Sequence, residues 1–245
     1  MPIGAIVGLA AFVTLSLALG VRLCLLAHRA GGLPEYALAV AFFFSGGIGA
    51  ALQAVKPLGL GSPEFQSASW ACVRASIDLG IGCQLLFTWR VFRPHSRGAA
   101  AAFFGFAAAA VAILVAYAGA GALGDPLYRG RWFFVEAALH LAALAWGTAE
   151  PLRYHARMVR RLRLGLADPV VANRFLVWGV AVGAALGAVA VPVAFEALRL
   201  ANQTGLLAGI TAGFALVSAL GYALTFFPPP AYRRFLERHA PAPVA

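Results

Sequence analysis

Residues 175–195 read FLVWGVAVGAALGAVAVPVAF, twenty-one residues without an acidic or basic side chain. A helix rises about 1.5 Å per residue, so about 20 apolar residues cross the hydrocarbon core of a membrane. Similar uncharged runs occupy residues 3–21, 36–55, 98–124 and 200–230. Two further segments, residues 70–89 and 132–148, are long enough only if charged side chains lie within the membrane. The sequence therefore predicts seven transmembrane helices.

The composition of the whole chain agrees with this prediction. Of its 245 residues, 62% are hydrophobic and 11% are charged, whereas soluble domains carry about a quarter charged residues. A soluble fold with so few would expose large apolar patches. We expect an all-α membrane protein, with residues 1–245 forming a single domain that is a bundle of seven transmembrane helices. The expected spans are, to within a few residues, 3–27, 35–56, 69–92, 99–123, 131–150, 169–196 and 202–227.

Basic residues near the span ends predict the orientation, because cytoplasmic connectors carry an excess of Lys and Arg. Thirteen lie after the first, third, fifth and last spans: Arg29, Arg90, Arg93, Arg97, Arg153, Arg157, Arg160, Arg161, Arg163, Arg174, Arg233, Arg234 and Arg238. Four lie on the other side: Lys56, Arg129, Arg131 and Arg199. We expect the N-terminus outside and the C-terminus in the cytoplasm. Topology also explains the net charge of +10, so we expect no nucleic-acid partner.

Four ionisable residues at membrane depth are the most informative side chains. Arg74 and Asp78 are four residues apart on the third span, as are Glu136 and His140 on the fifth, so each pair shares a helix face. Both spans run inward, and each pair begins four residues after a tryptophan. At equal depth, Arg74 would meet Glu136, and Asp78 would meet His140 one turn deeper. Charges inside a membrane usually face a partner in the bundle interior.

Two interpretations of this cluster remain open, and the sequence favours neither. The first is a polar pocket in the outer half of the bundle for a small ligand or protons, completed by Gln53, Ser76, Gln203 and Thr211. A carboxylate beside a histidine in a low dielectric suits a proton relay or a pH-sensitive switch. The second is a buried salt-bridge network that fixes the register of the helices.

The fifth connector is rich in arginine, with Arg153, Arg157, Arg160, Arg161 and Arg163. Apolar residues at a spacing of four lie among them, which predicts a short amphipathic helix on the inner leaflet. Anionic lipids attract such a segment. The same segment suits the docking of a cytoplasmic signalling protein.

Glycine recurs every four residues on the sixth span, at Gly179, Gly183 and Gly187. A small-xxx-small face of this kind lets another helix approach closely. We expect these glycines to serve helix packing, with an interface between two copies of the chain as the less frequent alternative.

Cofactor chemistry finds little support in the sequence. A retinal protein needs a Schiff-base lysine in its last helix, and the seventh span has none. Haem within a bundle usually takes paired axial ligands, but His140 is the single deep histidine. We find no cluster of three metal ligands and no catalytic motif. We therefore expect no cofactor, no metal and no catalytic residue, and an enzyme is the less favoured class.

Residues 160–175 read RRLRLGLADPVVANRF, and residues 89–94 read WRVFRP. In these segments the chain resembles an uncharacterised bacterial family of seven-helix membrane proteins, and the resemblance extends over its whole length. It implies a multi-pass protein of the bacterial inner membrane and no assigned activity.

The function favoured by the sequence is a sensor or receptor-like module. Its ligand site would lie in the outer halves of the second, third, fifth and seventh spans. The short tail after residue 227 carries no output domain, so we expect signalling through a separate cytoplasmic partner. One alternative is a small-solute or proton-coupled transporter that uses Asp78 and His140 as relay groups. Another is a membrane assembly subunit without a ligand.

Overall fold

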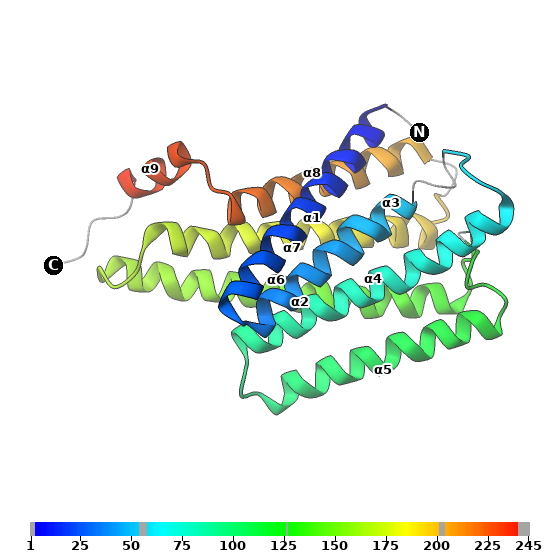
Figure 1. Cartoon of the computed structure of the whole chain (residues 1–245), viewed down its shortest axis with the longest axis horizontal. Coiled ribbons are helices and arrows are strands. Elements are labelled where there is room, and N and C mark those ends of the chain that lie inside the picture. The colour runs from blue at the N-terminus through cyan, green and yellow to red at the C-terminus, as the bar shows by residue number, and fades with distance from the viewer. Residues whose placement is uncertain (1–2, 54–57, 126, 201–203, 240–245) are drawn as a thin grey trace.

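The computed structural model describes residues 3–53, 58–125, 127–200 and 204–239, and these form a bundle of long helices without strands (Figure 1). The helices are α1 Ile3–Ala30, α2 Leu33–Ala41, η1 Phe42–Gly49, α3 Ala50–Gln53, α4 Pro63–Phe92, α5 Arg97–Gly119, α6 Arg131–Arg163, α7 Pro169–Ala197, α8 Thr204–Phe226 and α9 Pro230–Arg238. Seven helical segments of the described chain are long and apolar enough to cross a membrane. The predicted fold class is therefore confirmed.

Polar residues that precede proline or a helical run explain where three of the helices start. Asp168 caps α7, because its carboxylate accepts from the backbone N–H of Val170 at 2.7 Å, and Pro169 fills the first helical position. Ser62 and Ser96 cap α4 and α5 in the same way. Such side chains satisfy N–H groups that have no partner within the helix.

The second span consists of three segments, with the π-helix η1 between α2 and α3. Small residues let η1 lie unusually close to its neighbours. A Cβ atom on Gly47 would lie 2.5 Å from the side chain of Leu17 on α1, and one on Gly80 of α4 would lie 2.5 Å from Ser45. π-helical turns are rare and often occur at functional sites. Hydrophobic periodicity does not reveal them, and the sequence did not predict this one.

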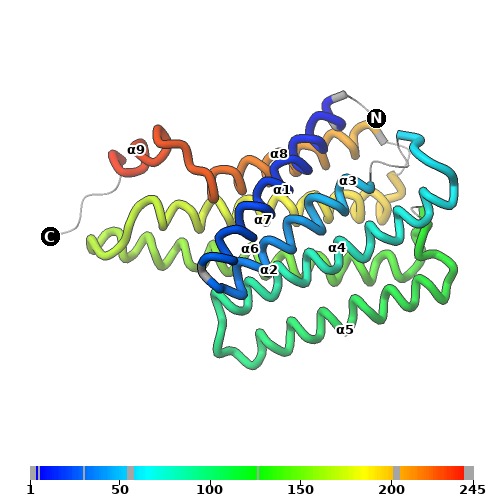
Figure 2. Tube along the Cα trace, viewed as in Figure 1, coloured from blue at the N-terminus to red at the C-terminus, as the bar shows by residue number. Residues whose placement is uncertain are grey.

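Six spans form a closed ring in which each packs against two neighbours. The contacts run from α1 to α2, α4, α6, α7 and α8, and from α8 back to α1. Within the described chain, α5 packs only against α4 and α6, and it lies along one edge of the bundle (Figure 2). The end at which α1, α4 and α8 finish is called the arginine-rich end below, and the other is called the opposite end.

Several helix ends differ from the expected spans. α6 has 33 residues and is about 50 Å long at about 1.5 Å per residue, so it extends beyond a hydrocarbon core of about 30 Å. The arginines that were expected to lie on a separate short helix belong to this continuous one. α4 starts at Pro63 instead of residue 69, and α5 ends at Gly119 instead of residue 123. The expected ends at residues 56 and 202, together with Lys56, lie outside the described residues.

Candidate functional site

Arg74 on α4 and Glu136 on α6 form a buried ion pair near the opposite end of the bundle. Arg74 Nη1 donates to Glu136 Oε2 at 2.7 Å, and the two side chains expose 7% and 10% of their area. The Tyr117 hydroxyl on α5 donates to the same oxygen at 2.6 Å. The guanidinium carbon of Arg74 also lies 3.9 Å from the centre of the Tyr117 ring. This contact therefore joins three helices.

Arg74 additionally holds the loop between α5 and α6. Its Nε donates to the carbonyl oxygen of Leu123 at 3.3 Å, and its Nη2 donates to that of Asp125 at 3.2 Å. All three guanidinium nitrogens thus have an acceptor. A buried ion pair whose cation has an acceptor for each of its nitrogens fits a structural contact.

Tyr117 is a member of this contact that the sequence analysis did not identify. Its side chain is completely buried. Tyrosines near span ends are usual at membrane interfaces, so its position alone does not distinguish it. The sequence of α5 does distinguish it, because Tyr117 is the only residue of this helix after Arg97 whose side chain can form a hydrogen bond.

Asp78 and His140 meet one helical turn deeper. His140 Nε2 lies 2.6 Å from Asp78 Oδ1, and the two side chains expose 8% and 6% of their area. The structure thus contains both contacts that equal depth predicted. The second carboxylate oxygen, Asp78 Oδ2, is buried without a hydrogen-bond partner among the described residues. The ring of Phe106 on α5 lies beside the imidazole, with 6.4 Å between ring centres.

With Asp78 and Glu136 ionised and His140 neutral, the four residues carry a net charge of about −1. Their charges cancel only when one more positive charge, a proton or another cation, is present at Asp78 and His140. Arg74 balances Glu136, so a neutral His140 leaves Asp78 as an uncompensated carboxylate. A charge at membrane depth without a counter-charge is costly. A proton shared by Asp78 and His140, or a cation at Oδ2, removes that cost. The deeper pair is therefore the part of the cluster with capacity for chemistry.

Asp78, Glu136 and His140 each place one potential ligand atom within 4.8 Å of the others. The expectation that no three metal ligands cluster is therefore wrong. Spacing along the chain does not show the cluster, because its ligands come from two different spans. Two carboxylates and an imidazole suit a divalent cation such as Zn²⁺. The Arg74 guanidinium on Glu136 weakens that attraction, and a single positive charge already neutralises the cluster.

A cavity of about 260 Å³ lies within the ring of six spans. All six spans contribute to its lining, and most of the lining is apolar. Phe12 of α1 and Leu144 of α6 both line it, although α1 and α6 are three helices apart in the ring. Its polar side chains are Ser45, Gln53, Gln84, Thr211 and Ser218. Thr211 Oγ1 is buried without a hydrogen-bond partner in the described chain. An apolar cavity with a few polar groups is the usual form of a small-molecule site.

The structure divides the predicted polar pocket into two sites on different faces of α4. Ile77 lines the cavity, whereas Asp78 contacts α6, because consecutive helical residues point about 100° apart. Gln53 and Thr211 therefore line the cavity and do not reach the charged cluster. The prediction of a single pocket is wrong in this respect. Ser76 is buried close to Gly49 of η1, and Gln203 lies outside the described residues.

An aromatic cluster lies beside the cavity; it consists of Phe42, Phe87, Trp178, Tyr222 and Phe226, of which Phe42, Trp178 and Tyr222 line the cavity. The Phe42 ring centre lies 4.7 Å from that of Tyr222 and 6.1 Å from that of Phe226. Trp178 lies 5.5 Å from Phe226 and 4.9 Å from Phe87. Phe226 is the last residue of α8, so the cluster extends from the cavity toward the arginine-rich end of the bundle.

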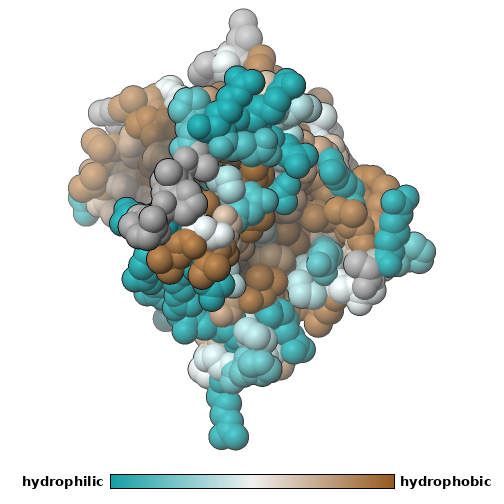
Figure 3. Space-filling view, turned by 90° about the vertical axis from the view of Figure 1, so that its left-hand side faces the viewer, coloured by the Kyte–Doolittle hydropathy of each residue, from teal (hydrophilic) through white to brown (hydrophobic). Residues whose placement is uncertain are grey.

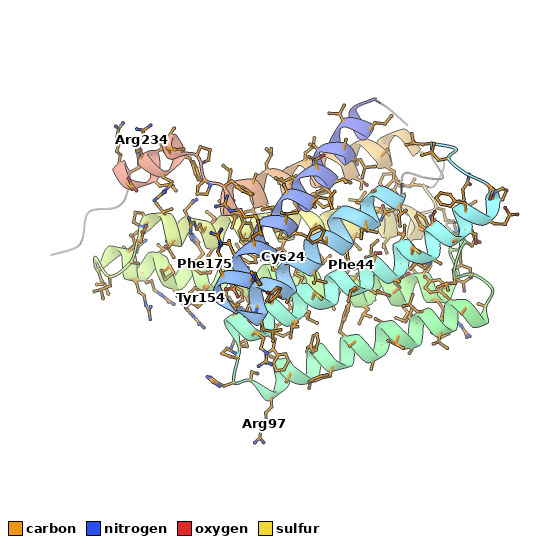
Figure 4. All side chains as sticks on the ribbon, in the orientation of Figure 1. Cys24, Phe44, Arg97, Tyr154, Phe175 and Arg234 are labelled. Carbon is orange, nitrogen blue, oxygen red and sulfur yellow. The ribbon has the colours of Figure 1, made fainter. Side chains whose placement is uncertain are left out.

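The arginine-rich end combines one buried acidic residue with many exposed arginines. Glu150 is buried and accepts hydrogen bonds from Arg93 at 3.1 Å, Trp146 at 3.2 Å and Arg153 at 3.4 Å. Exposed arginines of the α6 end are Arg153, Arg157, Arg160, Arg161 and Arg163. Figure 3 shows hydrophilic side chains spread over much of this end, and Figure 4 shows Arg97 and Arg234 pointing away from the bundle.

The helix α9 was not predicted and adds to this end. It is amphipathic, and it is joined to α7 by a hydrogen bond of 2.7 Å from Asn173 Nδ2 to the Tyr232 hydroxyl. Phe235 on α9 is 54% exposed. A short helix with arginines and exposed aromatic side chains is typical of a membrane interface.

The glycines of α7 lie in contacts within the bundle. A Cβ on Gly179 would lie 2.5 Å from Leu152 of α6, and one on Gly187 would lie 2.6 Å from Phe214 of α8. Gly183 lies against Thr148 of α6. Close approach to two neighbouring helices within one chain therefore accounts for the spacing.

No model of a known protein family, no curated protein and no solved structure matches this chain. The fold and composition define a class, a seven-helix integral membrane protein that crosses the membrane several times. The family resemblance of residues 160–175 stays a prediction.

Proposed function

We propose that the protein is a receptor-like module of the bacterial inner membrane that binds a small, mainly apolar molecule in the central cavity. The observation that carries this proposal is the apolar cavity within the ring of spans, with a Thr211 hydroxyl in its wall that has no hydrogen-bond partner among the described residues. Buried hydroxyls are normally hydrogen-bonded, so a ligand with one polar group would satisfy it.

The dimensions and lining of the cavity define the ligand class. Its volume of about 260 Å³ lies just below the range of about 300–1,000 Å³ typical of drug-sized ligands. No Asp, Glu, Lys, Arg or His is part of its described lining. A neutral ligand with one or two hydrogen-bonding groups, close to Gln53 and Thr211, fits this chemistry.

The aromatic cluster favours binding over passage. Phe42 and Trp178 line the cavity and pack against Phe226, the last residue of α8, so a solute that left along α8 toward the arginine-rich end would pass these rings. Phe42 and Trp178 line the cavity, so a ligand bound there would contact both rings. Ligand binding would thereby shift α7 and α8 relative to η1, which is a common form of signal transmission between helices.

We propose that the arginine-rich end is the surface that transmits the signal to a partner. The thirteen-to-four distribution of basic residues supports a cytoplasmic location for this end. Anionic lipids are the expected partner of the arginines at the end of α6 and on α9. A separate cytoplasmic signalling protein that contacts Arg157 and Arg160 would report the helix shift.

A thermal unfolding experiment tests the cavity with 1-octanol as the probe. The Ala215→Phe variant fills the cavity, whereas Leu220→Phe adds the same ring to an exposed position of the same helix. We expect 1-octanol to raise the unfolding midpoint of the wild type and Leu220→Phe, but not of Ala215→Phe. Equal responses of all three would show that octanol acts through the detergent or lipid, and the cavity proposal would fall.

A second candidate function, a proton-coupled carrier, is favoured by Asp78 Oδ2, which lies beside His140 and has no hydrogen-bond partner in the part of the chain that the structure describes. In liposomes with an internal pH dye, this candidate predicts solute-dependent proton entry that Asp78→Asn abolishes. Glu237→Gln, a change on the exposed helix α9, serves as the matched control. Proton entry that is unchanged in Asp78→Asn, or absent from the wild type, would exclude this function.

A further inference from the structure

A second hollow lies on the far side of α4 from the central cavity. It is a groove of about 280 Å³ between α4 and α5. Its lining is apolar except for Asp78 and the thiol of Cys83, and it includes Leu79, Phe103 and Phe106. Leu79 and Val111 at its edges are 45% and 62% exposed. Since α5 stands outside the ring of six spans, the groove opens sideways toward the lipid.

Asp78 gives this groove a defined electrostatic character. It is the only charged side chain in the groove lining, and its Oδ2 has no hydrogen-bond partner in the described part of the chain. The charged groups that face it from the neighbouring helices are His140, which contacts Oδ1, and the ion pair of Arg74 with Glu136, which is neutral as a unit. With His140 neutral, the lining of the groove therefore contains one negative charge, that of Asp78, without a counter-charge among these groups.

We propose that the α4–α5 groove binds a lipophilic amine, with its ammonium group on Asp78 Oδ2 and its hydrocarbon chain along Leu79, Phe103 and Phe106. One positive charge neutralises the cluster, and an N–H donor satisfies the unpaired oxygen. An alkyl chain matches the apolar lining and its lateral opening. A fatty acid would bring a second carboxylate close to Asp78, and a neutral alcohol would leave its charge uncompensated.

This site is separate from the central cavity of the proposed receptor, although it shares Asp78 with the second candidate function. Asp78 and Leu79 line the groove, whereas Ile77 and Ile81 of the same helix line the central cavity. The inference does not depend on the receptor role, because the central cavity holds a neutral ligand. A failed amine experiment would leave the octanol result on Ala215→Phe unaffected.

Dodecylamine is the probe, and dodecanol is the matched neutral compound of the same chain length. With the purified full chain in a mild detergent, we expect dodecylamine at a hundredfold excess over its Kd to raise the unfolding midpoint by about 5–10 °C. Dodecanol should shift it far less. Asp78→Asn removes the charge and should abolish the difference between the two compounds.

Two alanines on α5 provide a matched pair that leaves Asp78 in place. Ala107 lines the groove, and its neighbour Ala108 is exposed but is not part of the described lining. Ala107→Phe should block the dodecylamine shift, whereas Ala108→Phe should retain it. The proposal is overturned if dodecanol stabilises as well as dodecylamine, if Asp78→Asn responds like the wild type, or if both phenylalanine variants respond equally.

Discussion

His140 Nε2 lies 2.6 Å from Asp78 Oδ1, one helical turn below the 2.7 Å contact between Arg74 and Glu136. The two contacts look equivalent in sequence, since both join residues of α4 and α6 that are 62 positions apart. They differ in their surroundings. Every nitrogen of Arg74 has an acceptor, whereas one oxygen of Asp78 has no hydrogen-bond partner among the described residues. We assign stability to the upper contact and chemistry to the lower one.

The contact of Asp78 with His140 predicts that substitutions of these two residues have non-additive effects on the free energy of unfolding. Asp78→Asn and His140→Ala should each destabilise the protein, and the double variant should cost less than their sum. We expect a coupling of about 0.6–1.7 kcal/mol, the range of polar contacts between membrane helices. Unfolding of the four proteins of the cycle in the same detergent measures it. Strict additivity would show that the two side chains do not interact.

The contact of Arg74 with Glu136 predicts that two substitutions destabilise the protein to very different extents. Glu136→Gln leaves the buried Arg74 guanidinium without a counter-charge and should cost about 3–5 kcal/mol. Tyr117→Phe removes one of the two hydrogen bonds to Glu136 Oε2 and should cost about 0.5–1.5 kcal/mol. Unfolding in detergent provides both values. A loss of stability from Tyr117→Phe as large as from Glu136→Gln would contradict this assignment.

The sequence predicts those parts of the site that follow from regular helical spacing, and it does not predict those that depend on which helices are neighbours. Helical spacing and equal depth predicted the pairs of Arg74, Asp78, Glu136 and His140 correctly, because α4 and α6 run in the same direction and are in contact (Figure 1). Which face of α4 meets which neighbour depends on the ring order of the spans, and periodicity carries no information about that order. Gln53 and Thr211 were therefore assigned to the wrong neighbours.

Other features were missed because their causes are local to the packed structure. Gly46 and Gly47 of the π-helix lie close to Ser16 and Leu17 of α1, and such contacts leave no periodic signal. Gln84 and Tyr222 line the cavity. The sequence does not predict this, because polar and aromatic residues in a span also occur at helix contacts and at the membrane interface. The seven spans themselves follow from hydropathy alone and were predicted in number and approximate extent.

Glycine substitutions test the packing of α7. A methyl group on Gly187 would overlap the Phe214 ring, so Gly187→Ala should destabilise by about 1–3 kcal/mol. Gly105→Ala is the control, because nothing lies within 4 Å of the added atom. It should stabilise the helix by about 0.5–1 kcal/mol. If Gly187→Ala were also stabilising, α7 would not approach α8 as closely as the structure shows.

The orientation is tested by reporter fusions at the C-terminus. A fluorescent protein fused there should fluoresce, because it folds in the cytoplasm, whereas alkaline phosphatase at the same position should be inactive. The reverse result would place the arginine-rich end outside and would remove the proposed contact with a cytoplasmic partner.

The most direct test of the central claim is native mass spectrometry of the protein purified from its own membranes. Wild type, Ala215→Phe and Leu220→Phe would be prepared in parallel. A receptor with a small apolar ligand predicts one discrete bound mass in the wild type and in Leu220→Phe that is absent from Ala215→Phe. The same bound mass in all three proteins, or none in any of them, would contradict ligand binding in the central cavity.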